Sequence, residues 1–245
     1  MRKILLACLL GVTTFSLHAQ NVNTPDANFK AALTANPTIN TNMDAEIQET
    51  EASAYAGVLD VSNQGITDLT GIEAFTALSE LNCSSNSLTT LDLTANTALT
   101  ELRCYSNQLT TLDLSANTLL ENVNCLGNQL TTLDLSDHTA LLDLECGNNQ
   151  LTALNLNNCS ALSTLSVSGN DLSSIDLSTN TSLTSLSINQ NNLTSLDVTN
   201  NTLLTYISAS YNQLTALDVS NNTNLLTLQL YDTYQFTVNT IYTNI

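Results

Sequence analysis

The sequence predicts a repeat solenoid, a right-handed coil with one short parallel strand in each turn. Three observations support this fold class: a fixed internal period of 21 residues, an apolar–polar alternation inside each unit, and an asparagine at one place in each unit. Complete units begin at Leu78, Leu99, Leu120, Leu141, Leu162, Leu183 and Leu204. An eighth unit, from Leu225, breaks down after Leu230, and a degenerate unit precedes them all. A fixed period of roughly 20 to 50 residues indicates stacked repeats.

The elements within a unit follow from its pattern, L-x-x-L-x-(C/V/I)-x-x-N-x-L. One example is Leu99, Leu102, Cys104, Asn107 and Leu109. The alternation predicts a short strand with leucine and cysteine inward. The asparagines then form an internal column, because an amide carries both donors and acceptors for the turning backbone. The second half of each unit repeats the pattern but is rich in Thr, Ser and Asp. That composition disfavours a helix and predicts extended convex segments.

This pattern is that of the leucine-rich repeat, at the short end of its length range. It resembles the nested 21-residue subclass of bacterial secreted leucine-rich-repeat proteins and, more loosely, internalin-like surface proteins. The repeat region spans residues 57–230, and the resemblance covers about residues 58–230 of it. It implies a horseshoe-shaped solenoid, and it suggests adhesion or contact with a host or a neighbouring cell.

Composition excludes several classes of function. Four Lys and Arg residues stand against 22 Asp and Glu, with a formal net charge of −18. Because Arg2 and Lys3 lie at the start, only Lys30 and Arg103 remain beyond residue 19. Such a chain cannot neutralise several phosphates, so we expect no nucleic-acid or anionic membrane partner.

Residues 1–19 are typical of a secretory signal peptide, with a basic start, an apolar run and a small residue, Ala19, before the expected cut. A lipid anchor at Cys8 is the alternative. The sequence therefore predicts a protein that is secreted or associated with the cell surface, with no transmembrane segment after the leader.

A different kind of segment, residues 20–56, precedes the repeats. Pro25 and Asp26 predict a helix to about Ala35, and a second short helix should end near Tyr55. Between them, residues 40–51 resemble the 12-residue EF-hand calcium loop, with donors at Asn40, Asn42, Asp44, Glu46 and Glu51. Asparagine replaces the usual first Asp, and alanine replaces the usual glycine. The loop is therefore either a weak calcium site or a degenerate loop that caps the first coil; no other cofactor is expected.

The repeat-region cysteines recur at one inward position. Cys83, Cys104, Cys125 and Cys146 occupy four consecutive coils, where later units carry other apolar residues. We expect buried free thiols that act as small hydrophobes. Export leaves Cys83–Cys104 and Cys125–Cys146 bridges as the alternative.

Two faces of the solenoid carry polar columns. The concave strands should present acidic residues in the first coils, serines in the middle and tyrosines at the end. Candidate partner-binding residues there are Glu80, Glu101, Arg103, Tyr105, Asp143, Glu145, Tyr206 and Tyr231. The convex column contains Asp92, Asp113, Asp134, Asn155, Asp176, Asp197 and Asp218. We expect it to be a solvated ladder with Ser and Thr donors, or a weak divalent-ion site.

No catalytic motif appears, so the sequence predicts a noncatalytic recognition module that binds a protein, or a glycan, through the concave face. Alternatives are a structural spacer without its own ligand and a calcium-dependent surface protein. Residues 231–245 are either a C-terminal cap or the start of a further segment. Ligand identity and oligomeric state stay open.

Overall fold

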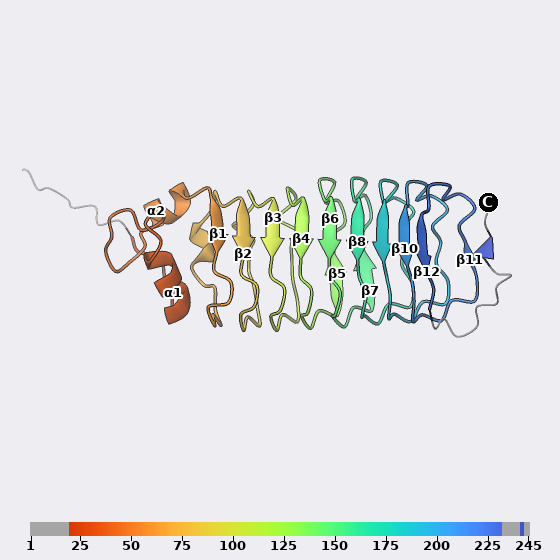
Figure 1. Cartoon of the computed structure of the whole chain (residues 1–245). Coiled ribbons are helices and arrows are strands. Elements are labelled where there is room, and N and C mark those ends of the chain that lie inside the picture. The colour runs from red at the N-terminus through yellow and green to blue at the C-terminus, as the bar shows by residue number, and fades with distance from the viewer. Residues whose placement is uncertain (1–19, 232–240, 243–245) are drawn as a thin grey trace, which may run out of the picture.

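The structure is a computed structural model, and it describes residues 20–231 and 241–242. Coils are stacked side by side along one axis, and a small helical cap lies at the N-terminal end (Figure 1). The predicted signal peptide, residues 1–19, and most of the tail lie outside the described residues. The predicted repeat solenoid is confirmed.

One parallel sheet of nine short strands runs the length of the stack, in the order β1-β2-β3-β4-β6-β8-β9-β10-β12. Its strands are β1 (Val58–Asp60), β2 (Glu80–Asn82), β3 (Glu101–Arg103), β4 (Asn122–Asn124), β6 (Asp143–Glu145), β8 (Thr164–Ser166), β9 (Ser185–Ser187), β10 (Tyr206–Ser208) and β12 (Thr227–Gln229). From β2 onward each residue lies opposite the one 21 positions later, as Leu81 lies opposite Leu102. The period therefore fixes the register, and equivalent side chains form columns.

The opposite side of the solenoid is mostly extended chain, as predicted. Short parallel pairs occur there between β5 (Thr132–Asp134) and β7 (Ala153–Asn155). Another joins β11 (Leu217–Asp218) to β13 (Ile241–Tyr242), which is the only described part of the tail after Tyr231. Few helices are present in the described chain, consistent with the Ser, Thr and Asp content of the second half-units.

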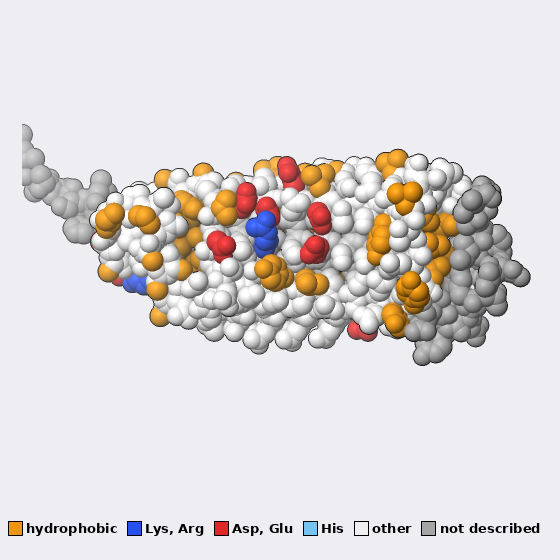
Figure 2. Space-filling model, viewed as in Figure 1, with side chains coloured by type: hydrophobic (Ala, Val, Ile, Leu, Met, Phe, Trp, Pro, Cys, Tyr) orange, Lys and Arg blue, Asp and Glu red, His pale blue; other side chains and the backbone are white. Residues whose placement is uncertain are grey.

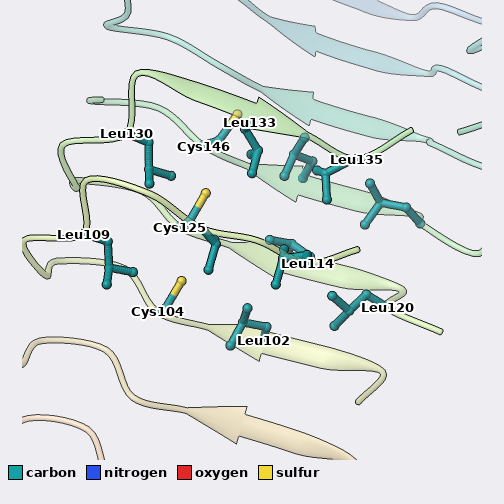
Figure 3. Packing of buried hydrophobic residues seen from close by; sticks show 14 of the residues in the cluster. Leu102, Cys104, Leu109, Leu114, Leu120, Cys125, Leu130, Leu133, Leu135 and Cys146 are labelled. Carbon is teal, nitrogen blue, oxygen red and sulfur yellow. The ribbon is translucent and has the colours of Figure 1, made fainter. Parts of the chain in front are cut away.

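The core consists of leucine and cysteine columns between these two sides (Figure 3). The thiols of Cys83, Cys104, Cys125 and Cys146 are free and have no exposed surface. Burial raises the pKa of the Cys83 and Cys125 thiols to about 12. The prediction of free thiols is therefore confirmed for these four residues, and their chemistry is that of small apolar side chains.

The asparagine column joins successive coils. Asn107 Nδ2 donates to the carbonyl oxygens of Cys83, at 3.0 Å, and Cys104, at 3.1 Å. Its Oδ1 accepts from the backbone N–H of Leu88 at 3.0 Å. The same three contacts recur at Asn128 and Asn170, so the predicted column is confirmed.

The N-terminal cap contains α1 (Ala27–Thr34) and α2 (Glu49–Ala54), and a 3-10 turn, η1 (Ile72–Ala74), follows in the degenerate first unit. Phe29 and Leu33 on α1 are fully buried and belong to the same hydrophobic core as the repeats. The cap therefore covers the apolar edge that the first coil would otherwise expose. No helix among the described residues is long and apolar enough to cross a membrane.

Candidate functional site

The outward face of the nine-stranded sheet, called the sheet face below, carries the eight candidate partner-binding residues. In most of its strands the middle residue is buried and the first and third are partly or fully exposed. Outward side chains of adjacent strands therefore lie next to one another across the whole stack.

A shallow hollow lies near the N-terminal half of the sheet face, with a volume of about 170 Å³. Its polar lining residues are Glu101, Arg103, Asn122, Asn124, Asp143 and Glu145. The hollow forms because β4 carries short asparagines between the longer charged side chains of β3 and β6. Figure 2 shows acidic side chains gathered around one basic group on this face. The structure thus brings four of the predicted residues together.

The charges in this hollow do not balance. Arg103 forms an ion pair with Glu101 on the same strand. Asn124 Nδ2 donates to Glu145 Oε2 at 2.6 Å. Burial, and then the nearby Glu145 carboxylate, raise the pKa of Asp143. Two carboxylates of β6 therefore lie side by side without a cation of their own among the described residues, and their mutual repulsion would be relieved by a positive group.

Glu80 and Tyr105 lie at the margins of the hollow rather than in its lining. Glu80 pairs in register with Glu101 on the neighbouring strand. Tyr105 follows β3 and is partly exposed, as is Leu126 at the equivalent place one coil later. Apolar surface therefore lies beside the charged groups, where it can pack against the stem of a long side chain.

Figure 2 shows hydrophobic side chains gathered in a second patch near the C-terminal end of the stack. Tyrosines and leucines are among the exposed large hydrophobic residues of these last coils. Tyr206 donates its hydroxyl to Gln229 Oε1 at 3.3 Å, and Tyr231 is 67% exposed. Tyr211, which donates its backbone N–H to the Tyr231 carbonyl, is 52% exposed. The sequence analysis did not predict the exposed Leu203 and Leu226. Both stand where other repeat units carry mostly small or polar residues, and this difference is visible in the sequence.

Beside Tyr206, polar side chains of neighbouring coils form a hydrogen-bonded floor on the sheet face. Ser208 Oγ donates to Asn189 Oδ1 at 2.7 Å and lies within 3.0 Å of Gln229 Oε1. Ser208 and Ser210 occupy outward positions on this face, but both are buried because neighbouring side chains cover them. The floor's polar groups are largely satisfied within the protein.

The EF-hand-like loop, residues 40–51, uses its predicted donors within the cap. Glu51 Oε1 accepts from the backbone N–H groups of Thr41, at 2.8 Å, and Asn42, at 3.2 Å. Asp44 Oδ1 accepts from the backbone N–H of Glu46 at 2.7 Å. Partial burial by itself would raise the pKa of Glu51, but hydrogen bonds from Gln48, Thr41 and Asn42 lower it overall.

Of the other three candidate ligands, Asn42 Oδ1 accepts the backbone N–H of Asp44 at 2.9 Å. The Asn40 Oδ1 atom is buried and has no hydrogen-bond partner among the described residues. Asn40 Nδ2 donates to the carbonyl oxygens of Thr34 and Asp44, at 3.0 and 2.8 Å. The Glu46 carboxylate forms an ion pair with Lys30 at 2.6 Å. Within the described chain, no group of three or more His, Cys, Asp and Glu residues is arranged to hold a metal ion. Calcium binding by this loop stays a prediction.

Calcium at millimolar concentration is expected to shift the thermal midpoint by less than about 2 °C relative to EDTA. A calcium ion would have to displace the hydrogen bonds that Glu51 and Asp44 already accept from the loop. Thermal unfolding of the wild type, Glu51→Gln and Asp113→Asn would measure this. A shift of several degrees that Glu51→Gln removes would contradict the expectation, whereas loss only in Asp113→Asn would locate the ion on the convex column.

The convex aspartates accept hydrogen bonds within local turns. In each Asp the Oδ1 atom accepts the backbone N–H two residues on, as from Thr94 to Asp92 at 3.0 Å. The same contact occurs at Asp113, Asp134, Asp176, Asp197 and Asp218. Hydrogen bonds from the backbone and hydroxyl of Ser115 lower the pKa of Asp113. The predicted ladder with Ser and Thr donors is therefore present.

Comparison with solved structures shows a likeness to internalins. The functional domain of InlJ from Listeria monocytogenes, which includes a cysteine ladder, is 36% identical over 86% of this chain, with a TM-score of 0.65. The chain has the leucine-rich-repeat fold and is similar to internalins. This chain spans 53% of the InlJ chain, about half its length. No protein-family model and no curated protein matches it.

Two further internalins from L. monocytogenes share the fold. Internalin C2 is 22% identical to this chain, with a TM-score of 0.75. The match covers 86% of this chain and 96% of the internalin C2 chain. Internalin F is 21% identical, with a TM-score of 0.53. The match covers 89% of this chain and 79% of the internalin F chain. At these identities the likeness shows the fold alone.

Proposed function

We propose that this chain is a secreted or cell-surface, noncatalytic recognition module that binds a protein partner through the sheet face. The observation that carries the proposal is that outward chemistry changes along the stack while the buried pattern stays constant. A spacer needs only the buried positions, which here repeat every 21 residues. The hollow on β3–β6 and the tyrosine patch on the last coils depart from that uniformity.

The partner's chemistry follows from the charge of the hollow. Asp143 and Glu145 face it without a cation of their own among the described residues, and Tyr105 adds apolar surface at its margin. A lysine or arginine side chain from an extended protein segment would supply the missing charge and pack its stem on that margin. Tyr206 and Tyr231 lie farther along the same face, at positions suited to an apolar anchor.

The test uses the full chain and a 16-residue peptide that contains spaced lysines and one tyrosine. We expect binding that weakens as salt rises, and at least tenfold weaker binding by the double variant Asp143→Asn with Glu145→Gln. The control is Asp176→Asn with Asp197→Asn, which removes the same charge from the convex side. Equal loss in both pairs would contradict a site on the sheet face.

A glycan ligand and a spacer role are the alternatives, and the same variants separate them. Glycan binding would be insensitive to the lysine content of a competing peptide and would be lost in Tyr206→Ala with Tyr231→Ala. A spacer would bind neither peptide nor glycan in any variant. The proposed export rests on residues 1–19, and precursor processing in an expressing cell would test it.

A further inference from the structure

Four exposed leucines lie along one rim of the solenoid, where the coils enter the strands of the nine-stranded sheet. Leu142 and Leu226 directly precede β6 and β12, and Leu119 and Leu203 stand shortly before β4 and β10. Between 43% and 85% of the surface of each leucine is exposed. These four residues are called the leucine rim below. Large apolar side chains that gather on one exposed surface mark contacts with another molecule.

The leucine rim consists of two equivalent pairs. Leu119 and Leu142 lie in neighbouring coils, and Leu203 and Leu226 stand four repeat units later, at the same two places of the repeat. Because coils stack about 4.8 Å apart, the two pairs are about 19 Å apart along the stack. The coils between the pairs carry small residues at these places, so a straight path joins the pairs. These small residues are Ala161, Ser163, Ser182 and Thr184.

The fold does not require leucine at these places. Where Leu142 and Leu226 stand, several other units carry a hydroxyl that joins two coils. Thr184 Oγ1 donates to the Ser163 carbonyl oxygen at 3.1 Å, and Thr205 Oγ1 donates to the Thr184 carbonyl oxygen at 3.0 Å. A leucine gives up that hydrogen bond and leaves apolar surface in water. Contact with another molecule explains leucine there, whereas stability of the coil does not.

The backbone of the rim is already hydrogen-bonded between coils. The Leu142 N–H donates to the Glu121 carbonyl oxygen, and the Leu142 carbonyl oxygen accepts from the Ser163 N–H, both at 2.8 Å. The Leu226 N–H donates in the same way to the Thr205 carbonyl oxygen at 2.9 Å. An added strand therefore finds no unpaired edge at these residues, and a partner must contact the leucines through side chains. An α-helix laid along the stack does so, because about 13 residues of helix span the two pairs.

The charges of the chain favour a basic partner over a second copy. Glu121 is exposed on the rim, at the place of Leu142 one coil earlier. Lys30 and Arg103 are the basic residues of the described chain, and each forms an ion pair with a glutamate of the same chain. A second copy would bring the same net charge of −18 to the contact, so the two copies would repel each other. Lysine or arginine residues of a partner would complement Glu121 instead.

We propose that the leucine rim is a docking surface for a basic amphipathic helix of a protein partner. The apolar face of that helix packs on both leucine pairs, and its basic residues lie beside Glu121. This inference rests on the recognition role proposed above. The rim is nevertheless separate from the hollow that Asp143 and Glu145 line, so either surface can fail without the other.

The test uses the full chain and a helical peptide of about 18 residues, with leucines along one face and lysines at one end. The variant Leu142→Thr with Leu226→Thr introduces the residue that other coils carry at this place, so it should fold. We expect it to bind the peptide at least tenfold more weakly, because each pair loses one leucine. The matched control is Met43→Thr with Val58→Thr, which removes two exposed apolar side chains elsewhere and should bind within about twofold of wild type.

A second peptide separates this surface from the sheet face. The peptide with spaced lysines and one tyrosine should bind wild type and the leucine variant equally. If that peptide fails to bind wild type while the helical peptide binds and depends on the leucines, the rim is supported and the sheet-face hollow is not.

Three results would overturn the proposal. One is equal binding of the helical peptide by wild type and the leucine variant, and another is no binding by wild type. The third is a wild-type dimer in sedimentation that the leucine variant does not form, which would assign the rim to a second copy of this chain.

Discussion

Replacing Asn128 with alanine is expected to lower the free energy of unfolding by about 3 to 5 kcal/mol. The buried amide donates to the carbonyl oxygens of Cys104 and Cys125, both at 3.0 Å, and accepts from the Leu109 N–H at 3.0 Å. Alanine leaves these groups without that partner in a site too apolar for water to replace every bond. Each unsatisfied buried group costs about 1 to 3 kcal/mol. Urea unfolding followed by circular dichroism measures the change.

The matched control is Asn200→Ala, because Asn200 is an asparagine of the same repeat region but is exposed. We expect its free energy of unfolding to lie within about 0.5 kcal/mol of the wild type. A second variant, Asn128→Leu, fills the volume without restoring the hydrogen bonds. Full recovery of stability in Asn128→Leu would contradict the hydrogen-bond explanation and assign the loss to the cavity.

Much of this architecture was predictable, because equivalent positions of the repeat have the same environment in every coil. The period places Leu81 against Leu102, and it stacks Cys104 on Cys125. Alternation sets which side chains point inward, and the recurring asparagine indicates a buried backbone turn. These inferences depend only on spacing, which the sequence displays directly.

The parts that could not be predicted depend on side-chain length and on contacts between non-equivalent residues. Alternation gives the direction of Ser208 but not its cover by neighbouring side chains. The hollow on the sheet face requires that Asn124 be shorter than Arg103 and Glu145 on either side. The ion pair of Glu46 with Lys30 joins two cap segments whose approach no repeat specifies.

The N-terminal cap is expected to loosen when Asp26 is replaced by alanine. Asp26 Oδ1 accepts the α1 N–H groups of Asn28 and Phe29, both at 2.9 Å. Its Oδ2 accepts the backbone N–H and the hydroxyl of Thr67, at 2.8 and 2.9 Å, in the degenerate first unit. One carboxylate thus caps the helix and joins it to the repeats. We expect a loss of about 2 to 4 kcal/mol, from the lost helix cap and the orphaned Thr67 N–H.

Hydrogen–deuterium exchange would locate this effect, with faster exchange in residues 27–34 and in the first unit than in later coils. The control is Asp68→Ala, because Asp68 accepts the N–H of Thr70, at 2.8 Å, in a local turn. It should leave exchange in α1 unchanged. Uniformly faster exchange along the whole stack in Asp26→Ala would contradict a local role for the carboxylate.

Acid provides an independent test of the same contact. Partial burial alone would raise the pKa of Asp26, but hydrogen bonds from Thr67, Phe29 and Asn28 lower it overall. A carboxyl group with a lowered pKa in the folded state adds stability above its unfolded pKa and loses it as pH falls through the folded one. The stability difference between wild type and Asp26→Ala should therefore be full at pH 7 and shrink below about pH 4. A difference that stays constant to pH 2.5 would mean that the ionised carboxylate does not hold the cap to the repeats.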